Sequence, residues 1–115
     1  MRGGKIEPAS TAADVLKSVE RIVKIPNALG LHARAAGRFV KVASGFKAAV
    51  TVDKEGVAVS GLSIMGLLML AAGVGTELRL HATGPDAAAA IQALAVLIED
   101  GFDEDNGGAP GPGSD

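Results

Sequence analysis

GLHARAAGRFVKVA, residues 30–43, is the stretch that decides the surrounding fold, because its pattern predicts an amphipathic helix. Its apolar residues recur at helical spacing: Ala36, Phe39, Val40 and Ala43. Another face carries the basic side chains Arg34, Arg38 and Lys41. We expect the helix to begin at His32, with Gly30 supplying flexibility just before it.

His32 therefore stands where a helix presents free backbone N–H groups and a partial positive charge. Such a position holds phosphate well and favours the neutral imidazole, whose free ring nitrogen is a nucleophile. With Arg34 two residues further on, the segment is a candidate site for carrying a phosphoryl group. The alternative is that His32 is only a polar residue of the N-cap region, and the local sequence leaves both interpretations open.

Length and composition bound the function. The 115 residues, 48% of them hydrophobic, predict one small globular domain. A net charge of -2 and an aromatic content of 3% argue against nucleic-acid binding. Without cysteine there is no thiolate metal site, and we expect neither a metal nor a cofactor. The longest apolar stretch, residues 64–74, is too short to span a bilayer, so we expect no membrane insertion. Because the chain lacks cysteine and its N-terminus lacks the apolar run of a signal peptide, we expect a cytoplasmic protein.

The chain divides into three parts by composition. Residues 1–18 are predicted to be a flexible extension, residues 19–102 the folded domain, and residues 103–115 a disordered tail rich in Gly and Pro. Apolar patterning predicts strands within the domain at residues 21–25, 46–53, 57–60 and 77–83. Helices are predicted to begin at His32, at Ser63 (ending near Gly73) and at Gly84-Pro85-Asp86, with Pro85 as the first helical residue.

The order βαββαβα predicts the fold class. Helices laid on one face of a mainly antiparallel sheet satisfy this order best. We therefore expect an α+β fold of four mainly antiparallel strands with three helices on one face.

Ser63 stands at the second predicted helix start. Serine is a good N-cap, so plain capping is the simplest interpretation. A phosphoserine there would be tolerated by the helix dipole and would add about two negative charges, which could block a partner. The helix that follows has no charged residue, and it predicts an exposed apolar patch of Ile64, Leu68 and Met65. The alternative is that neighbouring elements bury the whole helix.

Other polar residues have simpler interpretations. Arg34, Arg38 and Lys41 form a stripe that is either a solvated face or a surface that steers an acidic partner and neutralises phosphate. His81 is predicted to be an exposed residue of the last strand, since no carboxylate or histidine neighbours it in a metal-binding pattern. A hydrolase built on Ser63 is disfavoured because no nucleophile elbow surrounds it.

Four blocks of this sequence resemble the HPr family, the histidine-containing phosphocarriers of the phosphoenolpyruvate-dependent phosphotransferase system. They are NALGLHARAA at residues 27–36, Phe39-Val40, SIMGLLML at 63–70 and ATGPD at 82–86. The resemblance extends over about residues 19–102 and implies the family's open-faced β-sandwich.

The resemblance also implies a relay. His32 matches the histidine that takes a phosphoryl group on Nδ1 from phosphorylated enzyme I and passes it to an enzyme II A-type domain, so the chain would be a carrier and not an enzyme. Arg34 matches the arginine that supports the phosphohistidine. Ser63 matches the serine modified by HPr kinase/phosphorylase, and Ile64, Met65 and Leu68 match the docking surface, beside the partner-steering Arg38 and Lys41. We expect a monomer.

Three positions depart from the family pattern. Ala35 stands where proline is common, which we expect to be tolerated because alanine is a good helix former. Leu62 replaces a basic residue before the serine, and Ser60 replaces a common asparagine, which makes recognition of Ser63 by the kinase less certain than phosphorylation of His32. The sequence does not separate sugar uptake from a purely regulatory role. The remaining alternative is a small anion-binding regulatory domain without covalent phosphotransfer.

Overall fold

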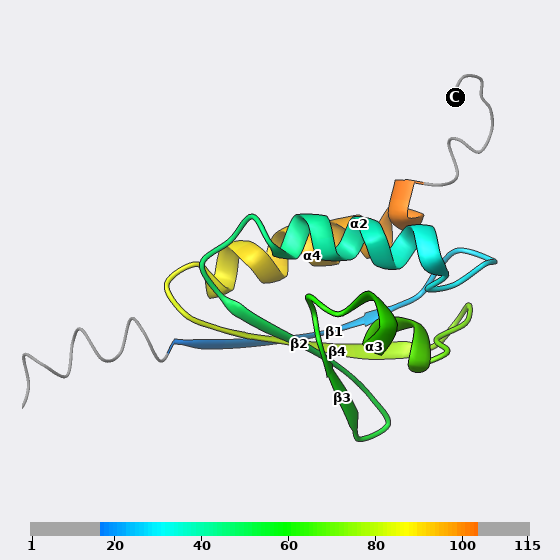
Figure 1. The fold of residues 1–115 in the computed structure, drawn as a ribbon, viewed down its shortest axis with the longest axis horizontal. Helices are drawn as coiled ribbons and strands as arrows, with labels where there is room; N and C mark the ends of the chain where they lie inside the picture. The colour runs from blue at the N-terminus through cyan, green and yellow to red at the C-terminus, as the bar shows by residue number, and fades with distance from the viewer. Residues whose placement is uncertain (1–16, 104–115) are drawn as a thin grey trace, which may run out of the picture.

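A computed structural model describes residues 17–103 (Figure 1). Its elements follow in the order β1 (Ser18–Lys24), α2 (Ala33–Ala43), β2 (Ala49–Lys54), β3 (Val57–Ser60), α3 (Ile64–Met69), β4 (Glu77–Thr83), α4 (Ala87–Glu99) and the 3-10 helix η1 (Gly101–Asp103). This order confirms the predicted βαββαβα arrangement. The predicted extension and tail lie outside the described residues, apart from Lys17, Ser18 and Asp103.

The four strands of the described chain form a single sheet in the order β1-β4-β2-β3. Every neighbouring pair is antiparallel, with Ile22 opposite Arg79 and Arg79 opposite Asp53. Side chains alternate between the two faces, so one face is apolar and the other carries most of the polar residues. The predicted α+β class with an antiparallel sheet is thus confirmed.

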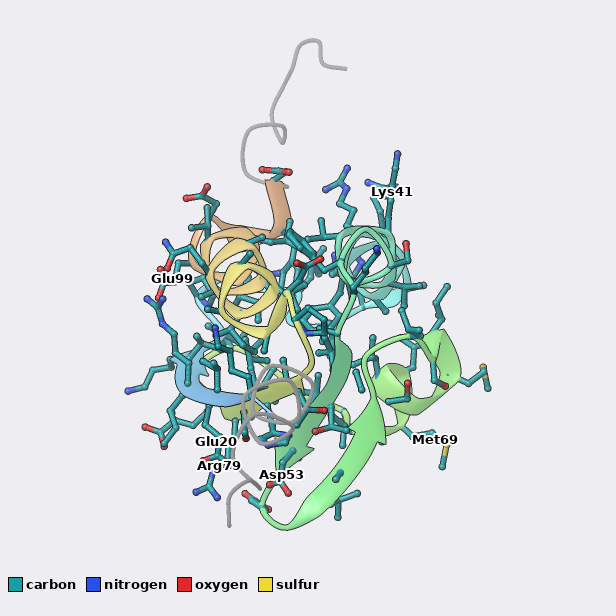
Figure 2. All side chains as sticks on the ribbon, turned by 90° about the vertical axis from the view of Figure 1, so that its left-hand side faces the viewer. Glu20, Lys41, Asp53, Met69, Arg79 and Glu99 are labelled. Carbon is teal, nitrogen blue, oxygen red and sulfur yellow. The ribbon has the colours of Figure 1, made fainter. Side chains whose placement is uncertain are left out.

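The helices cover the apolar face of the sheet. Figure 2, which looks along the two long helices, shows α2 and α4 side by side above it, with α3 beside β3. Helix α3 contacts both α2 and β3. The largest fully buried side chains between these layers are Phe39, Phe102, Ile25, Leu67, Leu78, Leu80, Leu94, Ile98 and Val52. One core therefore joins all the helices to the sheet.

Two strands begin elsewhere than predicted. β1 begins at Ser18, ahead of the predicted residue 21 and within the segment assigned to the extension, because its pairing with β4 continues to Thr83. β2 begins at Ala49 and not at residue 46. The chain before it is held in a bend, where Lys47 N–H donates to the Asp86 carboxylate at 2.8 Å. Contacts distant in sequence set both boundaries.

Two helix boundaries also differ from the prediction. α3 ends at Met69 and not near Gly73, because Ala71 adopts a left-handed conformation with φ of 52° and the Lys54 ammonium donates to the Leu70 carbonyl at 3.0 Å. α4 begins at Ala87 with Asp86 as its N-cap. Pro85 therefore precedes the helix and does not occupy its first position.

Candidate functional site

A tight turn at residues 27–30 leads the chain from β1 into the start of α2. The backbone N–H of Gly30 donates to the Asn27 carbonyl at 3.1 Å. The Asn27 side-chain amide donates to the Gly30 carbonyl at 3.0 Å, and Asn27 itself is buried. The same carbonyl accepts the His32 N–H at 3.0 Å. These bonds determine where His32 leaves the turn.

The loop after α3 packs against this turn through the backbone of Ala72. Gly30 has φ of 66°, and a Cβ added there would lie 2.4 Å from the Ala72 carbonyl oxygen. That oxygen also accepts the Leu31 N–H at 2.9 Å, and the Leu31 side chain is buried. Only glycine allows both the left-handed conformation and this close backbone approach. The loop that ends α3 thus helps to position the residue before His32.

His32 is the N-cap of α2, and it is partly exposed. Its ring Nδ1 accepts the backbone N–H of Arg34 at 3.2 Å. In a neutral imidazole an Nδ1 that accepts a hydrogen bond leaves the ring proton on Nε2. The lone pair of Nδ1 therefore points at the positive end of α2, where the first N–H groups of the helix gather. The predicted helix start at His32 is thus confirmed.

The three basic residues of α2 are not equivalent. Arg34 and Lys41 are exposed, and Lys41 projects away from the sheet in Figure 2. Arg38 is half-buried, and its guanidinium donates to the backbone carbonyl of Phe102. Since Arg38 holds the end of the folded chain, only Arg34 and Lys41 present their charges fully to solvent. Sequence patterning had no signal for this contact, because the two residues are 64 positions apart.

Ser63 is the N-cap of α3, and its hydroxyl oxygen accepts the Gly66 N–H at 2.9 Å. The structure thus gives Ser63 the capping role expected of it. Phosphorylation would replace the hydroxyl proton and leave oxygen acceptors for the Gly66 N–H, while adding negative charge at a helix N-terminus.

An apolar surface surrounds the start of α3. Ile64 is 42% exposed and Met65 68%, as the uncharged helix predicted. Leu68, also predicted to lie in the patch, is half-buried and packs against the core. Leu62 and Met69, which sequence analysis did not include, are 55% and 77% exposed. The apolar patch is hereafter Leu62, Ile64, Met65 and Met69.

His81 lies on the other face of the sheet, far in sequence from the candidate site. Its ring Nε2 is 2.8 Å from the Ser18 hydroxyl, and the side chain is half-buried. Within residues 17–103, no group of three or more His, Cys, Asp and Glu side chains is arranged to hold a metal ion. No helix in that range is long and apolar enough to cross a membrane.

Comparisons with known proteins agree with this geometry. The family described as PTS HPr component phosphorylation site matches residues 19–100. Phosphocarrier protein HPr of Neisseria meningitidis is 48% identical over 86 residues, covering 75% of this chain and 97% of that protein. Phosphocarrier protein NPr of Shewanella violacea is 43% identical over 89 residues, covering 77% and 98%.

Solved structures share the same fold. HPr-C-His from Thermoanaerobacter tengcongensis superimposes with a TM-score of 0.71 at 42% identity, covering 73% of this chain and 94% of that one. An HPr dimer from the same organism matches with a TM-score of 0.59, covering 70% and 92%. The fold, the helix-capping histidine and these relatives define a phosphocarrier of the phosphotransferase system. The chain belongs to the HPr family.

Proposed function

We propose that Nδ1 of His32 accepts a phosphoryl group from phosphorylated enzyme I and passes it to an enzyme II A-type domain. The observation that carries this proposal is the position of Nδ1 on a partly exposed ring, aimed at the N-terminus of α2. A carrier must be reached by a donor and then by an acceptor, which suits a surface histidine at a helix start better than a closed pocket.

The transfer is a displacement at phosphorus. The lone pair of Nδ1 attacks, the bond between phosphorus and its donor atom in enzyme I breaks, and a new N–P bond forms on His32. Before attack, Nδ1 must release the Arg34 N–H, a bond that is long at 3.2 Å. The freed N–H and the partial positive charge of the helix then stabilise the phosphoryl oxygens.

Arg34 supplies the second positive group. Its side chain is exposed two residues after His32, on the first turn of α2. An arginine guanidinium offers paired donors that match two phosphoryl oxygens. The enzyme partners would supply the rest of the transition-state environment, so the chain itself acts as a carrier and not as an enzyme.

The partners would dock on the apolar patch together with the basic residues of α2. The exposure of Ile64 and Met65, with Leu68 partly exposed beside them, supports this role, since exposed apolar surface marks interaction sites. Lys41 and Arg38 lie on the neighbouring helix and would steer an acidic partner.

Phosphorylation of Ser63 by HPr kinase/phosphorylase would regulate the relay. Ser63 stands between Leu62 and Ile64 in the chain, so a phosphate on it would place about two negative charges beside the apolar patch. A partner with an apolar or acidic docking face would then bind less well. Leu62 stands where the family commonly has a basic residue before the serine. This departure bears on recognition of Ser63 by the kinase and not on phosphoryl transfer to His32.

We expect this chain to act as a cytoplasmic monomer without a cofactor or metal, in sugar uptake or in a regulatory branch. Sedimentation of the unphosphorylated protein tests the monomer, because an edge strand such as β1 also allows pairing between copies. The two pathways are separated by measuring which acceptor takes the phosphoryl group. Transfer to a sugar permease indicates sugar uptake, and transfer to a regulatory A-type domain indicates the regulatory branch.

Intact mass spectrometry after incubation with phosphoenolpyruvate and enzyme I tests the central claim. We expect one acid-labile phosphoryl group on the parent protein and none on the His32→Ala variant. A His81→Ala variant is the matched control and should be labelled like the parent. If an enzyme I that labels another carrier leaves this chain unlabelled, the proposal fails and a reversible anion-binding domain takes its place.

A further inference from the structure

Helix η1, at the end of the described chain, is hydrogen-bonded to the middle of α2. Phe102 is fully buried, and its carbonyl accepts a hydrogen bond from the Arg38 guanidinium. Phe102 and Asp103 both adopt left-handed backbone conformations, with φ of 58° and 65°, which turn the chain as it leaves the core. Helix η1 contacts both α2 and α4. Arg38 therefore holds the last residues that the structure describes against α2.

This exit lies beside the basic residues of the helix. Arg38 is four residues from Arg34 and three from Lys41, and side chains at these spacings are neighbours with Cβ atoms about 5–6 Å apart. Figures 1 and 2 show η1 standing at α2 on the side away from the sheet, which is also the side to which Lys41 points. The basic stripe is hereafter Arg34, Arg38 and Lys41.

The chain that leaves at this point is acidic. Asp103 is exposed, and the next two residues are Glu104 and Asp105. These three residues form the acidic segment. Within residues 17–103, neither Arg34 nor Lys41 makes an ion pair; the salt bridge found there joins Arg21 to Glu99. The described fold thus leaves two exposed positive charges of the basic stripe uncompensated.

We propose that the acidic segment binds across the basic stripe and competes there with phosphate and with acidic partners. A residue extends the chain by at most about 3.3–3.6 Å, so Glu104 and Asp105 are within reach of side chains one helical turn from Arg38. Opposite charges at this separation attract, and the anchor at Phe102 raises their effective concentration. The contact needs no phosphotransfer, whereas the competition rests on the proposed function.

Exposed ion pairs are individually weak, so a partner can displace the segment. Each such pair changes an equilibrium by a few-fold at most, and we expect the three charges together to contribute about threefold to tenfold. An attraction of this size attenuates phosphorylation without preventing it. It is also screened by salt, because the Debye length falls from about 10 Å at 0.1 M to about 3 Å at 1 M.

Paramagnetic relaxation tests the contact. The chain has no cysteine, so a nitroxide on an Asn106→Cys variant labels a single site. We expect the label to broaden backbone amide signals of α2 at low salt. The broadening should weaken in 1 M salt and in the same protein carrying Asp103→Asn, Glu104→Gln and Asp105→Asn. Asparagine tolerates the left-handed conformation at position 103, so this neutralised variant keeps the turn. Equal broadening in both proteins would overturn the proposal.

Phosphotransfer tests the competition. At low salt the neutralised variant should be phosphorylated by enzyme I about threefold to tenfold faster than the parent, and the two rates should converge in 1 M salt. A control with Glu20→Gln, Glu55→Gln and Glu77→Gln removes the same net charge from exposed positions near the other face of the sheet, and its rate should match the parent. Equal rates for the parent and the neutralised variant would overturn the competition. Loss of labelling in every protein would refute the proposed function, while the nitroxide measurement still decides the contact.

Discussion

The starts of α2 and α3 use the same backbone device for different chemistry. Each begins with a side chain that accepts a helix N–H two or three residues ahead: His32 through Nδ1 and Ser63 through its hydroxyl. At α2 the capping atom is a potential nucleophile followed by exposed cations. At α3 it is a hydroxyl followed by an uncharged helix with an exposed apolar face.

This difference separates transfer from recognition. Both helix starts present backbone N–H groups that favour negative charge. Only the first has an imidazole nitrogen that can release a phosphoryl group to a second partner, since a serine phosphate ester is far more stable to transfer. The second start lies next to the exposed Leu62, Ile64 and Met65, where added charge would change docking in the proposed function. The capping side chain and its neighbours, and not the free N–H groups of the helix start, distinguish the two proposed roles.

The most severe way to break the comparison is to remove the nucleophile, once together with the cap and once with the cap kept. His32→Ala should abolish phosphotransfer and also lower the free energy of unfolding by about 1 kcal/mol through the lost cap. His32→Asn retains an acceptor for the Arg34 N–H, so it should lose transfer with little change in stability. Acid-labile labelling and urea unfolding measure the two effects. Residual labelling of either variant would remove His32 from the mechanism.

A charge at the second start should have the next largest effect. Ser63→Asp keeps a capping oxygen and adds one negative charge within the apolar patch. We expect phosphorylation by enzyme I to slow by about 10- to 100-fold, the result of about 1.4–2.8 kcal/mol lost by placing a charge in a partly desolvated interface. Ser63→Asn is the neutral control, with an equally good cap, and should retain most of the rate. Similar rates for the Asp and Asn variants would exclude charge as the regulatory signal.

Two glycines test whether the first helix start depends on the loop after α3. Gly30→Ala should lower the free energy of unfolding by about 2 kcal/mol, because the added Cβ would meet the Ala72 carbonyl in a left-handed backbone. Gly37→Ala, within α2 and with open space at its Cβ, should raise stability by about 0.5–1 kcal/mol. Thermal unfolding compares them. A harmless Gly30→Ala would show that the contact with Ala72 is dispensable.

The smallest expected effect tests the apolar patch at α3 as a surface that partners recognise. Met65→Ala removes an exposed apolar side chain and should weaken binding to enzyme I by about fivefold, the result of losing roughly 1 kcal/mol of buried apolar area. Stability should hardly change, since Met65 is exposed in the free protein. Titration calorimetry measures the affinity. Val57→Ala, another exposed apolar residue but at the β2–β3 hairpin, should bind like the parent.

Much of the fold could be predicted because its periodicities are local. Phe39 and Ala43 recur at helical spacing and are buried, and Leu78 and Leu80 alternate with polar residues and point into the core. The boundaries were less predictable. Pairing with β4 lengthens β1, and a bond between Lys47 and Asp86 delays the start of β2. Such contacts join residues far apart in the chain, so no local pattern contains them.

The candidate site divides in the same way. A glycine, a histidine and an arginine before an amphipathic segment were enough to place His32 at a helix start, and Ser63 was recognisable as a cap. The sequence did not predict the close approach of Gly30 to the Ala72 carbonyl. It also did not predict the hydrogen bond from Arg38 to the Phe102 carbonyl. The apolar patch was predicted in part: Ile64 and Met65 are exposed, whereas Leu68 packs inward.

The sequence by itself determined which residues could do chemistry and on which elements they lie, because helix and strand periodicity, capping residues and charge are properties of neighbouring positions. Tertiary structure alone decided how the turn before His32 is held, which cations remain exposed and that Arg38 holds Phe102 at the end of the described chain. Those outcomes depend on packing between α2, the loop after α3 and η1. The physical reason is that hydrogen bonds and burial act through space, without regard to separation along the chain.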